Sequence, residues 1–386
     1  MRPENRSLPE PYGTAIAAIS VVGAAIGVTT PLLAFEMEAR GASATFIGLN
    51  TAVMGVSTIV TAPQVPRLAA MLGTSRAMLA SLALGAAMLL AFHVVEPLWL
   101  WFPIRFVFGA ALSVLFVLSE FWINAAAPDH RRGFVMGVYA TVLAIGFAVG
   151  PGILAVLGTQ GPAPYLAGAA LFALAAWPIL LAARSAPRLP REGRARVLAF
   201  VLAAPAATLA GLIVGAVEQG GMAFLPLYGA GLGMAETRAV LLVSVFILGN
   251  VAVQIPVGLV SDRMDRRKLL LAIGVAGLAG TLAIPAVAGV PVLFEAVVFV
   301  WGGVLGALYT VGLAHLGARF RGHDLAAANA AFVMCYSLGF LVGPPALGAG
   351  MDLAPPHGML APIAVLLAVY CAVVALRLRC EGPSGA

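Results

Sequence analysis

The residues able to do acid–base chemistry are few, and they stand in unusual places. Five ionisable side chains lie inside long apolar segments: Arg105, Glu120, Glu218, Glu295 and His315. An ionisable group within a bilayer-spanning helix costs about 2.5–3.5 kcal/mol or more on insertion scales, so such groups are retained mainly where they have a function. We therefore treat these five residues as candidates for binding and releasing protons.

Arg105 and Glu120 belong to one regularly spaced series. Steps of three or four residues lead from Arg105 through Gly109, Ser113 and Phe116 to Glu120, and residues at these intervals share one face of an α-helix. At a rise of 1.5 Å per residue, the two charged groups are about 22 Å apart along the helix. They cannot form an ion pair with each other, so Arg105 needs a different acid.

Glu218 is the preferred partner for Arg105, with Glu295 as the second choice. The Gln-Gly-Gly that follows Glu218 allows another helix to approach closely and the backbone to unwind locally. Apolar surroundings favour the protonated form of a carboxyl group, whereas a nearby guanidinium favours the ionised form. A conformational change that alters either influence would bind or release a proton. We therefore predict proton coupling through Glu218, together with Arg105 and Glu120.

Each of these groups also has a purely structural interpretation. Glu218 could accept a hydrogen bond from a tyrosine hydroxyl or a backbone group in a static bundle. Glu120, beside Trp122, could anchor a helix at the membrane interface. Glu295 and His315 fit interfacial positions better than a central site. These alternatives stay open at the level of sequence.

Polar and aromatic residues of other apolar segments could line a substrate cavity. The candidates are Ser113, Phe116, Gln219, Asn250, Gln254, Tyr309, Asn329 and Tyr336. The sequence has no Walker loop, HExxH motif or Ser/His/Asp nucleophile pattern. Its three cysteines lack metal-ligand spacing, and Met222 and Met234 with His315 lack the paired spacing of a copper site. We expect no catalytic residue, no metal and no cofactor.

The composition determines which elements must position these side chains. The 386 residues are 61% hydrophobic and only 10% charged, whereas soluble domains are about 45–50% apolar and about 25% charged. A soluble fold could not hide so much apolar surface, but a bilayer removes the need. Closed barrels require alternating strands, and this chain instead has long unalternated runs of Ala, Leu, Val and Gly.

Twelve apolar segments are long enough to cross a bilayer. They cover approximately residues 12–34, 44–66, 76–95, 98–122, 133–157, 163–183, 198–228, 237–260, 268–288, 291–317, 325–350 and 359–377. We predict an all-α polytopic membrane protein with twelve transmembrane helices. The polar start runs directly into the first full-length segment, and we expect no cleavable signal peptide.

The basic residues predict the orientation. With the N-terminus in the cytoplasm and alternating spans, all of the 22 Lys and Arg residues fall on the cytoplasmic side except Arg40, Arg105 and Arg238. This is the distribution that the positive-inside rule describes. The net charge of +6 then reflects topology and contact with anionic lipid. We expect a lipid bilayer as partner, no nucleic acid, and both termini in the cytoplasm.

Three sequence landmarks recur at a nearly constant offset. Residues 66–76 match 258–268 at an offset of 192, and residues 105–116 match 298–309 at 193. The third landmark consists of Gly146, Gly150 and Pro151, which recur at 193 as Gly339, Gly343 and Pro344. We predict two pseudo-symmetric six-helix bundles, residues 1–183 and 197–386, joined by a polar cytoplasmic linker at 184–196.

These landmarks resemble the signatures of the major facilitator superfamily over the whole chain. The loop signature G-x-x-x-D-R-x-G-R-[RK] appears as Gly258, Asp262, Arg263, Arg266 and Arg267, with Asp265 where glycine is usual. The signatures R-x-x-x-G and G-x-x-x-G-P appear as Arg105 with Gly109, and as Gly146, Gly150 and Pro151. Segments 119–124, 217–229, 308–317 and 327–344 further resemble the YcaD-like branch.

The resemblance implies gating roles for these motifs. In the family the loop aspartate caps a helix of the opposite bundle and steadies the outward-open state. The first loop copy departs from the pattern, with Pro66, Ala70 and Thr74 in place of Gly, Asp and Arg, so we expect Asp262 to cap the start of the fifth span. The fifth-span signature, repeated at Gly343 and Pro344, accompanies antiport in the family, although helix packing alone explains it equally well.

The combined expectation is a secondary transporter that works by alternating access. We favour proton-coupled antiport, and hence export of a small organic or amphipathic compound, by a monomer in a bacterial inner membrane. Import of a metabolite or vitamin by proton symport or uniport is the first alternative. A non-transporting membrane receptor or scaffold is the second, although a scaffold has no need of the gating loop and Gly-Pro elements.

Overall fold

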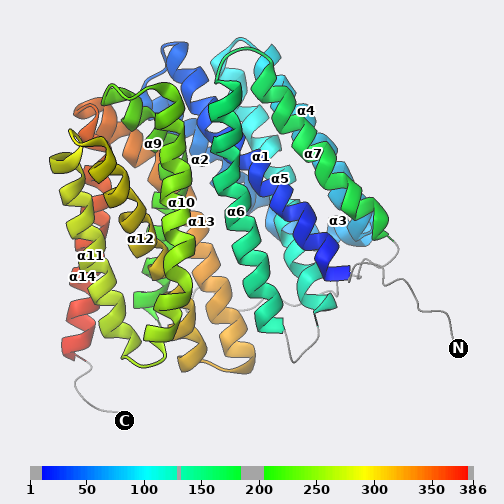
Figure 1. The fold of residues 1–386 in the computed structure, drawn as a ribbon. Coiled ribbons are helices and arrows are strands. Elements are labelled where there is room, and N and C mark those ends of the chain that lie inside the picture. Colours follow the sequence, from blue (N-terminus) through cyan, green and yellow to red (C-terminus); the bar gives the residue numbers. More distant parts are fainter. Residues whose placement is uncertain (1–10, 128–131, 184–203, 381–386) are drawn as a thin grey trace, which may run out of the picture.

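A computed structural model describes residues 11–127, 132–183 and 204–380, and within these ranges the chain is helical, with no strand. Twelve helices are long and apolar enough to cross a membrane. They are α1 (Pro11–Ala39), α2 (Ala44–Thr61), α4 (Thr74–Val94), α5 (Trp101–Ala126), α6 (Arg132–Leu157), α7 (Ala163–Leu181), α9 (Pro205–Gly231), α10 (Glu236–Ser261), α11 (Arg266–Val287), α12 (Pro291–Arg319), α13 (Gly322–Leu353) and α14 (Leu360–Cys380). The predicted all-α architecture is confirmed (Figure 1).

Four short helices complete the described chain. The helices η1 (Ala62–Gln64) and α3 (Val65–Leu72) continue α2, so that the second span runs from Ala44 to Leu72. The 3-10 helices η2 (Leu98–Leu100) and η5 (His357–Met359) precede α5 and α14.

The first span is longer than the sequence predicts. Residue 34 was the expected end, because Glu36 and Glu38 follow, but α1 continues to Ala39. Glu36 forms an ion pair at 2.8 Å with Arg40, one helical turn later. Met37, which lies between them in the sequence, is fully buried. Gly41, with a φ of 80°, then reverses the chain in a conformation that favours glycine.

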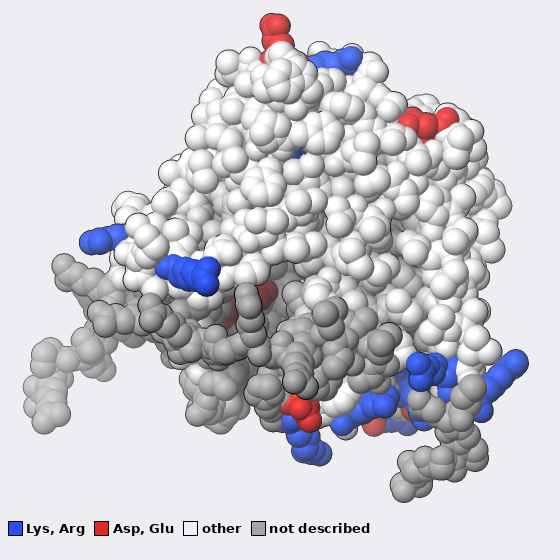
Figure 2. Space-filling view, turned by 180° about the vertical axis from the view of Figure 1, so that it is seen from behind, with Lys and Arg blue, Asp and Glu red and all other residues white. Residues whose placement is uncertain are grey.

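The charged residues divide the molecule into two ends. We call the end that carries the α3–α4, α10–α11 and α12–α13 connections the basic end. Its described basic residues are Arg67, Arg76, Arg263, Arg266, Arg267, Lys268, Arg319, Arg321, Arg377 and Arg379. Figure 2 shows charged groups gathered towards the two ends and an almost uncharged flank between them. Such a flank suits the hydrocarbon layer of a membrane.

Glycines set the closest helix contacts within each half of the chain, for which we use α1 to α7 and α9 to α14. Helix α6 packs on α1, and α13 packs on α9. A Cβ built on Gly150 would lie 2.5 Å from the Cα of Gly27, and one on Gly343 would lie 2.5 Å from the carbonyl oxygen of Ala216. The repeated Gly-x-x-x-Gly-Pro signature therefore lets two backbones touch at equivalent places, as small residues do between membrane helices.

This contact leads to a matched pair of substitutions. We expect Gly150→Ala to lower the melting temperature in detergent, because the added methyl overlaps α1 and such overpacking costs about 1–3 kcal/mol. Gly152→Ala, on the same helix, is the control, since a Cβ there would meet nothing within 4 Å. It should be neutral or stabilising by about 0.5–1 kcal/mol through helix propensity. Equal shifts for both variants would contradict the packing role.

The halves meet along two seams, α2 with α13 and α6 with α10, and Figure 1 shows α6 and α10 side by side. Glycines bring the two backbones together at points along the α2–α13 seam. A Cβ on Gly48 would lie 2.9 Å from the Cα of Pro345, and one on Gly55 would lie 2.9 Å from the amide nitrogen of Leu341. The predicted linker at 184–196 lies outside the described residues, so the division into bundles 1–183 and 197–386 stays a prediction.

Candidate functional site

Glu218 stands on α9 at the point where α13 comes closest. A Cβ on Gly215, one turn before Glu218, would lie 3.2 Å from the Cα of Tyr336 on α13. This close approach lets the Tyr336 hydroxyl donate a hydrogen bond of 3.0 Å to Glu218 Oε2. Among the described residues, no Lys, Arg or His nitrogen lies within 4.0 Å of the Glu218 carboxylate. The Glu218 carboxyl group is therefore held by one neutral donor.

The ring of Tyr336 belongs to a chain of aromatic contacts. The ring of Tyr336 lies 5.7 Å from that of Tyr309 and 4.8 Å from that of Phe340, and Tyr309 lies 5.1 Å from Phe332, measured between centroids. Tyr309 and Phe332 meet edge to face at 77°, a geometry that aromatic pairs prefer. We call Glu218, Tyr309, Phe332, Tyr336 and Phe340 the acidic aromatic cluster.

A second carboxylate approaches this cluster from the first half. Tyr139 on α6 donates a hydrogen bond of 3.1 Å to Glu120 Oε1 on α5. The Glu120 side chain is accessible to solvent although protein atoms surround it closely. Tyr309 interacts electrostatically with both Glu120 and Glu218. Two carboxylates, one from each half, therefore share one tyrosine-rich region.

Arg105 lies elsewhere, near the start of α5, and is 1% exposed. Its Nη2 is 3.4 Å from Thr51 Oγ1 on α2, while Nε and Nη1 have no partner in the described structure. Asn50, beside Thr51, is fully buried, and its side-chain oxygen and nitrogen also have no partner there. The expected partners are engaged differently, because Glu218 accepts from Tyr336 and Glu295 pairs with Arg238 at 2.5 Å. The structure thus does not bring Arg105 and Glu218 together.

The remaining cavity candidates occupy varied environments. Ser113 is buried without a partner for its hydroxyl, and Gln219 Nε2 is 3.7 Å from Met54 Sδ of the first half. Gln254 donates a hydrogen bond of 2.9 Å to Asn250 on the same helix. Phe116 is half-buried and Asn329 is exposed. His315 lies among the charged groups near the basic end.

The residues of the gating signature lie at the basic end. Asp262 accepts a hydrogen bond of 3.2 Å from Arg266 at the start of α11, and the Asp262 side chain is 70% exposed. Arg263 is exposed and Gly258 has open space around it. Residues 128–131, before α6, lie outside the described structure, so capping of the fifth span by Asp262 stays a prediction.

Asp265 explains the departure from the loop signature. Its carboxylate accepts a hydrogen bond of 2.9 Å from the Arg267 backbone amide and caps the N-terminus of α11, a role for which aspartate is well suited. Partial burial alone would raise the pKa of Asp265. The backbone hydrogen bonds and the charges of Arg267 and Lys268 outweigh it, and the pKa lies below the usual value.

Two polar contacts close the end opposite the basic end, which we call the sealed end. Asp352 at the end of α13 accepts hydrogen bonds from the backbone amides of Ala44 and Thr45, each at 2.8 Å, and from the Thr45 hydroxyl at 2.6 Å. Thr159 after α6 donates to Glu236 at the start of α10. Asp352 and Thr159 are 193 positions apart, and Glu236 and Ala44 are 192 apart. The repeat therefore relates the two contacts, which we call the latches.

Further contacts between the halves lie away from the basic end. Ser244 donates a hydrogen bond of 2.6 Å to the Ala148 carbonyl across the α6–α10 seam. The hydrogen bonds between the halves that the described residues show thus lie at the sealed end and towards the middle.

Sequence reasoning missed several residues that the structure makes prominent. Tyr139 was not among the candidates, and its distance from Glu120 in the sequence gave no signal. Asn50 could have been found as an amide inside an apolar segment. Asp352 and Glu236 could have been found by asking which polar residues coincide at the repeat offset.

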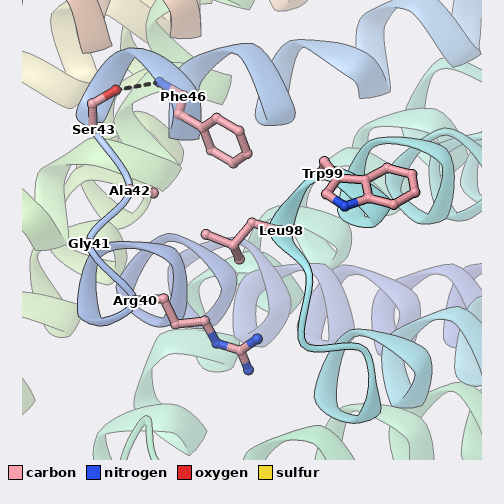
Figure 3. A pocket seen from close by; sticks show the side chains of 7 residues that line it. All are labelled: Arg40, Gly41, Ala42, Ser43, Phe46, Leu98 and Trp99. Carbon is pink, nitrogen blue, oxygen red and sulfur yellow. Dashed lines mark hydrogen bonds between the residues drawn. The ribbon is translucent and has the colours of Figure 1, made fainter.

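A surface depression of about 520 Å³ lies at the sealed end. All of its lining residues belong to the first half, and none of them belongs to the acidic aromatic cluster. Its lining residues are Arg40, Gly41, Ala42, Ser43, Phe46, Leu98 and Trp99. Figure 3 shows Phe46 and Leu98 pointing towards one another across it, while Arg40 points away. Arg40 is already engaged by Glu36 and by the Glu96 carbonyl. The depression holds no unengaged charged group and is a poor site for proton chemistry.

Comparisons with known proteins agree with this architecture. The protein named "Uncharacterized MFS-type transporter YfkF" of Bacillus subtilis is 23% identical over 340 residues, which is 86% of either chain. An MFS-type transporter of Yersinia pseudotuberculosis is 29% identical, and one named YcaD of Salmonella arizonae is 24% identical. These two alignments cover 64% and 65% of either chain.

The fold is also found in a solved structure, that of the nucleoside transporter NupG. The match has a TM-score of 0.74 over 96% of this chain and 98% of NupG, at 14% identity. At that identity the likeness concerns the fold alone. The family model described as Major Facilitator Superfamily matches residues 15–241 and 207–385. The twelve membrane-crossing helices, the repeated signatures and this match over nearly the whole length together place the chain in the major facilitator superfamily of membrane transporters.

Proposed function

We propose that the protein is a proton-coupled antiporter that exports a small organic or amphipathic compound by alternating access. The observation that carries this proposal is the Glu218 carboxyl group, which lies within the membrane-crossing part of α9 and has Tyr336 as its hydrogen-bond partner. A carboxyl group without a counter-ion in such surroundings is readily neutralised by a proton. Exchange of that proton for substrate would couple the two movements.

An alternating-access cycle needs one state in which the two halves are closed at one end of the molecule, and the structure described here would be that state. The halves are bonded at the sealed end by Asp352 with α2 and by Thr159 with Glu236. If the basic end faces the cytoplasm, as the positive-inside rule indicates, this is an inward-facing state of an inner-membrane monomer. Glu218 and Glu120 would then exchange protons with the cytoplasm.

In the opposite state the gating loop would act. We infer that Asp262 exchanges Arg266 for the start of α6 when the basic end closes, because aspartate is favoured at a helix N-terminus by about 0.3–1 kcal/mol. Arg105 would act as a fixed positive charge near the sealed end and promote release of the proton from Glu218 as the halves rock. Pro151 lies inside α6 and Pro344 inside α13. Because proline removes a backbone hydrogen bond, the helices would bend at these residues during that movement.

The test measures proton movement in everted membrane vesicles. Respiration acidifies the lumen and quenches acridine orange, and an exported compound restores the fluorescence when protons leave in exchange. We expect recovery on addition of at least one compound from a panel of cationic, neutral and anionic organic molecules. Glu218→Gln should abolish that recovery at equal protein level, because the amide cannot carry a proton.

Glu295→Gln is the matched control, since Glu295 pairs with Arg238 between α10 and α12 of the same half. It should leave the recovery unchanged. Full recovery by Glu218→Gln, or no response to any compound by the unaltered protein, would refute the antiport proposal.

Import by proton symport is the second candidate. The amide groups of Gln219, Asn250 and Gln254 suit a neutral polar solute, which they could bind by hydrogen bonds without any charge. A symporter would move protons in the same direction as the solute. A pH-sensitive dye inside proteoliposomes would therefore report the opposite sign of proton flux.

A further inference from the structure

We propose that the acidic aromatic cluster recognises an organic cation with an apolar body, so that the exchanged substrate is an amphipathic cation. This inference rests on the proposed function and names the substrate class of the same site. It combines the charge of Glu218 with the ring faces of Tyr309, Phe332, Tyr336 and Phe340.

The cluster carries a negative charge whenever its carboxyl group has released its proton. Glu218 belongs to it, and Glu120 of the first half interacts electrostatically with the same tyrosine, Tyr309. The described Lys and Arg residues lie at the two ends of the molecule, apart from Arg105. Arg105 is packed against Thr51 of α2 and is not within ion-pair distance of Glu218. An anionic substrate would be repelled here, whereas a cation would be attracted.

The kind of cation follows from the neighbouring groups. Metal ions such as Ca²⁺ need six to eight oxygen ligands, and the described residues contain no cluster of three His, Cys, Asp or Glu side chains that could hold a metal. The cluster instead presents rings, whose faces attract cations by about 0.5–2 kcal/mol each, the more so when desolvated. A quaternary or delocalised organic cation sheds little hydration on entry. Its apolar groups would pack against Phe340, which is half-buried, whereas Phe332 is fully buried and supports Tyr309 from behind.

Tyr309 is the ring that such a cation would contact first. It lies on α12 within 5.7 Å of Tyr336 and 5.1 Å of Phe332, centroid to centroid. It is also the residue that interacts with the carboxylates of both halves. A cation held against Tyr309 would therefore be in the field of Glu120 and Glu218 together. Closure of the halves around it would strengthen both attractions.

The experiment compares two probes of the same size and shape but opposite charge. Binding of tetraphenylphosphonium and of tetraphenylborate to the purified protein in detergent is measured by equilibrium dialysis at pH 8. We expect the phosphonium to bind and the borate not to bind above the detergent background. Glu218→Gln should weaken phosphonium binding at least tenfold. Tyr309→Leu should weaken it about two- to thirtyfold through loss of the ring, and Tyr309→Phe should stay within about threefold.

Phe299→Leu controls for the loss of any aromatic ring, because Phe299 lies on the same helix α12 with an exposed side chain. It should bind the phosphonium like the unaltered protein. The inference is overturned if the borate binds as well as the phosphonium, if neither binds, or if Glu218→Gln leaves phosphonium binding unchanged. The melting temperature of each variant shows whether a loss of binding reflects unfolding.

Dialysis measures binding without transport, so the two proposals can fail separately. Phosphonium binding that needs Glu218, without any proton movement in the vesicle assay, would uphold the cation site and refute antiport. Proton-coupled flux of a neutral compound, with no phosphonium binding, would uphold antiport and refute the cation site.

Discussion

Replacing Arg105 by methionine is expected to raise the melting temperature of the protein while abolishing coupled transport. Arg105 is 1% exposed, and two of its three guanidinium nitrogens have no partner in the described structure. A buried charge without a counter-ion is costly, and replacing buried charged groups by apolar ones of similar volume is neutral or stabilising by about 1–4 kcal/mol. Methionine fits irregular space well, so we expect a gain of several degrees.

Loss of function should accompany this gain because the proposed cycle needs a positive charge near the sealed end. Thermal unfolding in detergent and the vesicle assay are measured on the same preparations. Arg105→Lys, which keeps the charge, should be no more stable than the unaltered protein and should retain part of the coupling. A fall in melting temperature for Arg105→Met would show that the guanidinium contributes net stability, and unchanged flux would remove Arg105 from the mechanism.

Removing both latches is expected to open the sealed end. In Asp352→Ala the amides of Ala44 and Thr45 lose their acceptor, and loss of a helix cap costs about 0.5–2 kcal/mol. Glu236→Ala removes the partner of Thr159, and hydrogen bonds to charged groups contribute about 1.5–3 kcal/mol. We therefore expect each change to shift the population about tenfold towards the opened state, and the pair to act additively, since the latches lie on different seams.

Distances between spin labels report this opening. Gln160 and Val292 are exposed at the sealed end on opposite halves, so labels there should move apart in the double variant. Asp352→Asn should keep most of the closed state, because asparagine caps helices nearly as well as aspartate. Glu295→Ala is the control for loss of an acid at the same end, since its partner Arg238 is in the same half. An unchanged distance distribution in the double variant would mean that the apolar seams alone close this end.

The fold could be predicted from the sequence because its determinants are local and repeated. Lengths of apolar runs specify the helices, and the predicted span 98–122 differs from the observed Leu98–Ile123 by one residue. The predicted end of α1 was too early. The ion pair between Glu36 and Arg40, four residues apart, lets the helix continue past the two acidic residues. Ion pairs between residues four positions apart stabilise a helix.

The site could be predicted only in part, because it depends on which faces meet. Glu218 and Tyr336 were both candidates, yet their hydrogen bond joins residues 118 positions apart. That contact arises from the glycine at position 215, where α13 can approach α9. The Arg105 pairing rested on similar depth in the membrane, but depth says nothing about direction around the helix axis. The roles of the site and gating residues stay predictions.

The glycine-lined seam between α2 and α13 has a kinetic consequence. Where Gly48 faces Pro345 and Gly55 faces Leu341, backbone meets backbone, because glycine has no side chain that could interlock with the opposite helix. Two such surfaces can separate without a series of rotamer changes, which is the step that slows the parting of interdigitated helices. The barrier to opening would then lie mainly in the few polar bonds at the rim. Substitutions at the latches could then change the lifetime of the closed state without altering the helices that carry the site.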